Sequence, residues 1–128
     1  MREESKHWFE QSKHDLKAAQ YNFDGDILDV ASYLCQQSIE KGLKSLIIEK
    51  NREAPGVSHS LIKLGKEVEI PSKYYRILKE ISQEYFISRY PDAIGYTPYD
   101  TYDKQEVKEI IKNTKEIIKW IENQIKKL

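Results

Sequence analysis

Apolar residues recur every three or four positions along the chain, and almost no stretch alternates between apolar and polar residues. Apolar residues at this spacing form the buried side of amphipathic helices, whereas half-buried strands alternate with a period of two. The pattern therefore predicts an all-α fold made of five helical segments. We expect them at residues 3–23, 27–50, a short helix after Ser58, 73–88 and 103–128.

Turn and cap residues mark where the expected helices begin and end. Asp24-Gly25-Asp26 separates the first two helices, and Asp26 is placed to cap the second. Pro55-Gly56 lies in a stretch of loop composition, and Ser58 and Ser72 are placed to cap the two helices that follow. These elements predict an up-and-down bundle of four long helices plus one short helix.

Each expected helix carries an apolar stripe that would face the core. In the first helix the stripe consists of Trp8, Leu16, Ala19 and Phe23. In the second helix it consists of Ile27, Val30, Ala31, Leu34, Ser38, Leu43, Leu46 and Ile47. The last helix has the clearest stripe, which continues from Val107 to Leu128.

Length and charge narrow the range of functions. With 128 residues, the chain has the size of a single domain, which would span residues 1–128. It carries 21 Lys and Arg residues against 21 Asp and Glu residues, so its formal net charge is zero. This balance disfavours a general nucleic-acid coat or a polybasic membrane binder, because both depend on excess positive charge. A local basic patch stays compatible with it.

Cysteine usage and the N-terminal residues indicate a cytoplasmic setting. Cys35 is the single cysteine, so the chain has neither an internal disulfide nor a cysteine zinc cage. The polar N-terminus lacks the apolar region of a signal peptide, and no stretch is apolar enough to span a membrane. Lysine and glutamate are enriched, which is typical of thermophilic proteins, although an AT-rich genome would also favour lysine.

The first candidate functional residues lie in the expected second helix. Gln36, Gln37, Glu40, Lys41 and Lys44 place polar groups on adjoining helix faces at spacings of three and four residues. One interpretation is a solvated helix face with a Glu40–Lys44 ion pair. The other is a set of glutamine hydrogen bonds across a helix-packing interface.

Arg52 and His59 form the second candidate. An arginine can hold a phosphate while a nearby histidine moves a proton, and this pair suffices for metal-independent RNA cleavage by the neighbouring 2′-hydroxyl. In the alternative interpretation, His59 supports the start of the third helix next to Ser58. Both interpretations are compatible with the sequence.

The third candidate is the tyrosine-rich stretch from Tyr85 to Asp103, which contains Arg89, Tyr90 and Asp92. A loop of this length is often functional or part of an interface. Three interpretations are open. The loop is a structural element pinned over the end of the bundle, it binds a protein partner, or its tyrosines stack on a nucleotide or RNA. The histidines, cysteine and acidic residues show no convincing metal-ligand spacing, and phosphate-binding glycine loops are absent. We therefore expect no metal and no cofactor.

Taken in order, several short motifs resemble the HEPN family (higher eukaryotes and prokaryotes nucleotide-binding domain). The N-terminal half contributes Trp8, Asp15-Leu16-x-x-Ala19 and Tyr33-x-x-Gln36-Gln37-Ser38-x-Glu40-Lys41-x-x-Lys44. The C-terminal half contributes His59-x-Leu61-x-x-Leu64, Tyr85-x-x-x-Arg89-Tyr90-Pro91-Asp92 and Trp120-Ile121. The resemblance extends over nearly the full chain.

The resemblance implies a small helical bundle that commonly forms homodimers. Stand-alone prokaryotic members are often encoded beside a minimal nucleotidyltransferase, and some such pairs act as toxin–antitoxin modules. Many HEPN proteins are metal-independent ribonucleases with an Arg-x4–6-His motif, and Arg52 and His59 have that spacing here.

Three hypotheses follow for the function. The first is a homodimer that binds a nucleotide, a minimal nucleotidyltransferase partner, or both. Its expected binding residues are Gln37, Glu40, Lys41, Lys44, Arg89, Tyr90 and Asp92. The second is a ribonuclease toxin in which His59 moves a proton and Arg52 holds the phosphate. The third is a structural adaptor without catalysis.

Overall fold

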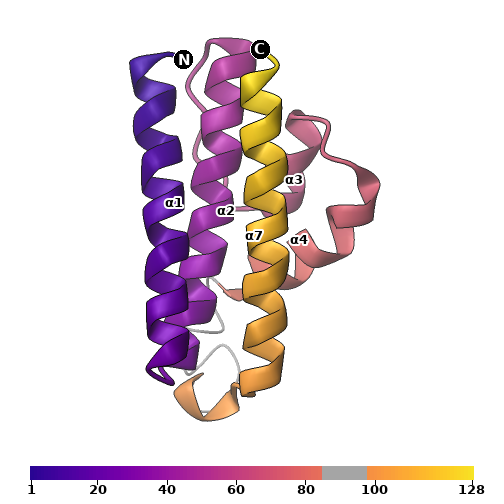
Figure 1. The fold of residues 1–128 in the computed structure, drawn as a ribbon. Helices are drawn as coiled ribbons and strands as arrows, with labels where there is room; N and C mark the ends of the chain where they lie inside the picture. Colours follow the sequence, from indigo (N-terminus) through magenta and orange to yellow (C-terminus); the bar gives the residue numbers. More distant parts are fainter. Residues whose placement is uncertain (85–97) are drawn as a thin grey trace.

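The structure is a computed structural model that describes residues 1–84 and 98–128. Three long helices lie side by side and form its main body (Figure 1). They are α1 (Glu3–Asp24), α2 (Leu28–Asn51) and α7 (Lys104–Lys126). The chain runs along α1 in one direction and along α2 and α7 in the other, so both termini lie at the same end of the bundle (Figure 1). The described residues form helices and loops without a strand, which confirms the all-α bundle.

Shorter helices connect α2 with α7. Within the described residues they are α3 (Leu61–Glu67), the 3-10 turn η1 (Ser72–Tyr74), α4 (Tyr75–Ser82) and the 3-10 turn η2 (Pro98–Thr101). The expected helix over 73–88 therefore begins as a 3-10 turn and continues as α4, and residues 85–88 lie outside the described part. Among the described helices, none combines the length and the apolar content that a membrane span needs.

Three of the expected helix caps differ in the structure. Ser72 is the first residue of η1 rather than a cap, and neither η1 nor α4 has a side-chain cap hydrogen bond. Asp26 does not cap α2, because it has a left-handed backbone (φ 62°) and Ile27 takes the cap position without a side-chain hydrogen bond. Aspartate tolerates this backbone conformation, and the tight turn after Gly25 requires it. Ser60 caps α3 in place of Ser58, since its hydroxyl accepts a hydrogen bond from the Lys63 amide at 3.3 Å.

The buried side of α1 also differs from the expected stripe. It consists of Ser5, Phe9, Ser12, Asp15 and Ala19. Of the expected residues only Ala19 is fully buried, and Trp8, Leu16 and Phe23 lie at the flanks. At the start of α2, Ile27 and Val30 are exposed rather than buried. The remaining expected stripe of α2 is buried or half-buried.

Serines hold α1 and α2 together. The hydroxyls of Ser5 and Ser45 each donate to the backbone carbonyl of the other residue, at 3.0 and 2.9 Å. Ser12 and Ser38 repeat this arrangement at 2.6 and 2.8 Å. Reciprocal bonds of this kind satisfy all four buried hydroxyls. Because the side chains are small, the two helices lie close together and fix the polar side of α2 against α1.

Candidate functional site

A line of buried polar side chains runs along α2. Gln36, Glu40 and Lys44 are four residues apart, so they share one side of the helix. Gln36 is fully buried, and Glu40 and Lys44 are each only 5% exposed. Glutamate and lysine are rarely buried to this extent unless they are paired. This line is therefore the most unusual polar feature of the described core.

Glu40 lies at the centre of this line and accepts three hydrogen bonds. Its Oε1 atom lies 2.9 Å from Gln36 Nε2 and 3.0 Å from His59 Nδ1. Its Oε2 atom accepts a bond from Lys44 Nζ at 3.0 Å, so the expected Glu40–Lys44 ion pair is present. We call Gln36, Glu40, Lys44 and His59 the Glu40 cluster.

The Glu40 carboxylate is ionised at neutral pH. Burial alone would raise its pKa, but the hydrogen bonds from Gln36, His59 and Lys44, together with the lysine charge, lower it below its ordinary value. An ionised carboxylate only accepts hydrogen bonds, so the His59 Nδ1 atom must carry the proton that joins them. The cluster thus fixes both the orientation and the tautomer of the imidazole.

His59 is the member of the Glu40 cluster that reaches the surface. Its side chain is 52% exposed, whereas the side chains of Glu40 and Lys44 are each 6% exposed. It lies in the loop before α3, where Ser60 provides the helix cap. The His59 side chain therefore contacts Glu40 of α2, while Ser60 caps α3.

A second polar contact crosses from α2 to α1. Lys41 Nζ donates to Asp15 Oδ2 at 2.6 Å, and Gln11 Nε2 donates to Asp15 Oδ1 at 2.9 Å. Gln37 instead donates to its neighbour Gln36 at 2.6 Å, so the glutamines bond within α2. The expected bonds across the interface are thus made by Lys41 rather than by the glutamines.

Lys44 also contacts an aromatic ring of α1. Its Nζ atom lies 5.6 Å from the centre of the Trp8 ring, within the range of a cation–π interaction. Sequence reasoning did not connect Trp8 or Asp15 with the polar residues of α2. Both residues belong to the series of motifs over which the chain resembles the HEPN family. That shared membership is the sequence feature that could have linked them to the polar residues of α2.

The other expected site residues are not part of the Glu40 cluster as the structure describes it. Arg52 ends α2 with a left-handed backbone (φ 58°), and its exposed side chain forms no hydrogen bond or ion pair with any described residue. It is therefore not joined to His59. Arg89, Tyr90 and Asp92 lie outside the described residues.

Neither the cysteine nor a metal cluster offers an alternative centre. Cys35 is buried, and burial raises the pKa of its thiol to about 12, so the reactive thiolate is scarce at neutral pH. Within residues 1–84 and 98–128, no group of three or more histidine, cysteine or acidic side chains could hold a metal ion.

Two solved structures are similar to this chain over nearly its whole length. TT1696 from Thermus thermophilus is 26% identical, with a TM-score of 0.87, and the alignment covers 96% of this chain and 99% of that one. ST0689, an archaeal HEPN homologue, is 28% identical, with a TM-score of 0.82 and coverage of 98% and 99%. A comparison with curated proteins found no match.

The family assignment rests on the sequence as well as on the fold. The HEPN domain profile matches residues 5–124, which include nearly all of the three long helices and the whole Glu40 cluster. Both solved relatives match over 99% of their own chains, so each consists of this fold alone. The chain therefore belongs to the HEPN domain family.

Proposed function

We propose that this protein binds a nucleotide at a surface site centred on His59. The observation that carries the proposal is the contact of His59 with Glu40, because a buried ionised carboxylate holds a half-exposed imidazole in one orientation. A half-exposed imidazole held in this way is placed to meet a phosphate or a base at the surface. The proposal agrees with nucleotide binding as the resemblance implies it.

The α2 residues would position His59 rather than contact the nucleotide. Glu40, Lys44 and Gln37 already bond to neighbouring side chains, and Lys41 is paired with Asp15. A ligand that bound to these groups would have to break their existing hydrogen bonds. Breaking them costs more free energy than binding to an exposed group does. His59 is the contact residue in this proposal because its side chain is half-exposed, whereas Glu40 and Lys44 are buried.

A titration of the purified protein with nucleoside triphosphates tests the proposal. His59→Ala should weaken binding by about tenfold or more, since a hydrogen bond to a charged phosphate is lost. His14→Ala is the matched control, because His14 is an exposed histidine on α1, and it should bind as the wild type does. The absence of binding by the wild type, or equal binding by all three proteins, would refute the proposal.

We further propose that the protein forms a homodimer and associates with a minimal nucleotidyltransferase in a toxin–antitoxin-like module. The support is the resemblance to stand-alone prokaryotic HEPN proteins. Where a gene for a minimal nucleotidyltransferase neighbours the gene of this protein, co-expression of the two should yield a complex that copurifies through size-exclusion chromatography. Separate elution of the two chains would contradict this association.

Ribonuclease activity is a second candidate function, and the same carboxylate–imidazole contact favours it. His59 would take the proton of an RNA 2′-hydroxyl while that oxygen attacks the adjacent phosphorus. The bond to the 5′-oxygen would break, and the protonated imidazole would return the proton to that oxygen. Arg52 would offset the phosphate charge. The products would be a 2′,3′-cyclic phosphate and a 5′-hydroxyl.

Incubation with cellular RNA in EDTA tests the second candidate. Cleavage by the wild type that is lost in both His59→Ala and Arg52→Ala, but kept in His14→Ala, would support it. Intact RNA after incubation with the wild type would exclude it. A protein that neither binds nucleotides nor cleaves RNA would leave the adaptor hypothesis.

A further inference from the structure

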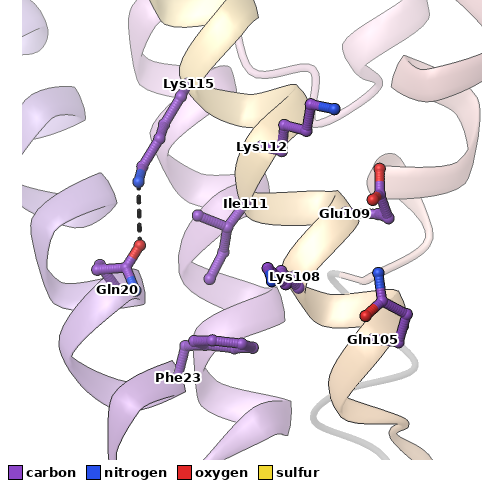
Figure 2. A pocket seen from close by; sticks show the side chains of 8 residues that line it. All are labelled: Gln20, Phe23, Gln105, Lys108, Glu109, Ile111, Lys112 and Lys115. Atoms are coloured by element: carbon purple, nitrogen blue, oxygen red, sulfur yellow. Dashed lines mark hydrogen bonds between the residues drawn. The ribbon is translucent and has the colours of Figure 1, made fainter.

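A long groove runs between α1 and α7, away from the Glu40 cluster. One hollow of about 550 Å³ lies between Phe23 of α1 and Lys108 of α7, and a second of about 500 Å³ lies beside Leu16 and Ile118. Gln20 and Lys115 line both hollows and bond to each other at 3.1 Å (Figure 2). The two hollows therefore adjoin at this bond, and we call them together the α1–α7 groove.

The α1–α7 groove is strongly basic. Its lining contains six lysines and two glutamates, which leaves a net charge of +4 on a chain whose total is zero. The lysines are Lys13, Lys17, Lys108, Lys112, Lys115 and Lys119. Those of α7 are three or four residues apart and follow one side of the helix. Like charges gathered in this way favour an anionic partner.

The floor of the groove is apolar. Leu16, Ile111 and Ile118 lie between the two rows of lysines. Phe23 is the one aromatic residue in the described lining, and Lys104 Nζ already lies 5.1 Å from the centre of its ring. RNA-binding grooves present several aromatic rings on which bases stack. An aliphatic floor between basic rims instead suits the apolar side of an amphipathic helix.

The dimensions of the groove fit a helix as well. Its lining extends from Gln105 to Glu122 on α7, which corresponds to about 25 Å of helix. We propose that the α1–α7 groove docks an acidic amphipathic helix of a protein partner. The apolar side of that helix packs on Leu16 and Ile118, and its carboxylates pair with the lysines on the rims.

A synthetic peptide tests this proposal on the full chain. The probe is a fluorescent peptide of about 16 residues, with leucines at helical spacing and glutamates elsewhere. It should bind with saturation, and Lys108→Glu with Lys112→Glu should weaken binding by about tenfold. The matched control is Lys6→Glu with Lys63→Glu, which changes the net charge equally at exposed positions outside the groove and should keep the wild-type affinity.

Two further probes separate the proposal from its alternatives. A peptide with the same composition in scrambled order should bind at least about tenfold more weakly, because its apolar residues no longer share one side. Equal binding of both peptides, or equal losses in both lysine variants, would reduce the effect to general charge attraction and overturn the proposal. Tighter binding of a single-stranded oligouridylate, lost in the groove variant, would also overturn it in favour of RNA.

Discussion

Glu40 is the residue on which the candidate site depends, because Gln36, Lys44 and His59 all donate to its carboxylate. The sequence predicted the Glu40–Lys44 pair but not its burial. Glutamate and lysine four residues apart are typical of exposed helix faces. The contact with His59 joins residues 19 positions apart, and a helical pattern carries no information about such a contact.

Replacement of this carboxylate should destabilise the protein. Glu40→Gln leaves the Lys44 ammonium buried without a counter-charge, so we expect the free energy of unfolding to fall by about 3 kcal/mol. Urea unfolding followed by circular dichroism measures the change. Glu80→Gln is the matched control, because Glu80 forms an exposed pair with Arg76 at the same spacing and should have little effect. Equal stability of Glu40→Gln and the wild type would contradict the burial of this pair.

The same comparison should depend on pH. The folded protein lowers the pKa of Glu40, so the stabilisation from this group is fully present above the ordinary carboxyl pKa of about 4.3. It is lost as the pH falls through the lower pKa of the folded state. The difference in unfolding free energy between the wild type and Glu40→Gln should therefore be constant near neutral pH and shrink below about pH 4. A difference that grows as the pH falls below about 4 would have the wrong sign.

At the scale of the elements, helical spacing predicted the three long helices with ends close to those observed. It did not predict which side of α1 is buried. The apolar stripe favoured Trp8, whereas Ser5 and Ser12 occupy the contact with α2 because their hydroxyls bond to backbone carbonyls there. A sequence pattern that scores serine as polar misses a buried serine whose hydrogen bonds are satisfied.

Gly42 of α2 is packed closely against α1 and α7, so a larger side chain at this position should destabilise the protein. A Cβ atom there would lie 3.0 Å from Ser12 Oγ, 3.0 Å from Ile121 Cδ1 and 3.1 Å from Ile118 Cδ1. Alanine favours a helix over glycine by about 1 kcal/mol, but overpacking costs about 1–3 kcal/mol. We expect Gly42→Ala to lower the melting temperature and the control Gly25→Ala, where contacts are 3.7 Å, to leave it nearly unchanged. A higher melting temperature for Gly42→Ala would show that the packing around Gly42 is loose enough to accept a methyl group.

At the scale of the whole molecule, the zero net charge conceals separate regions of opposite sign. Six lysines line the α1–α7 groove, whereas Glu80, Glu84, Glu106 and Glu109 line a hollow between α4 and α7. The sequence excluded a uniformly basic surface, and it left room for a local basic patch. The position of that patch depends on which sides of α1 and α7 meet, and only the folded structure supplies this.

Exposed apolar side chains predict where the proposed homodimer forms. Ile27 is 48% exposed at the start of α2, and Val30, three residues further along, is 38% exposed. Apolar groups gathered in this way favour an interface. We expect light scattering to give about twice the chain mass of 15.1 kDa and Ile27→Ser with Val30→Ser to give the monomer mass. Val57→Ser, at a 92% exposed position elsewhere, should keep the dimer. A wild-type monomer at micromolar concentration would contradict the dimer.

The central claim is that Glu40 holds His59 at the surface as the residue that contacts a nucleotide. Nuclear magnetic resonance of the histidine rings during a nucleotide titration tests it most directly. We predict that the His59 ring shows a proton on Nδ1 and that its signals shift with saturation, while those of His14 stay constant. Saturable nucleotide binding that leaves the His59 signals unchanged would contradict the account.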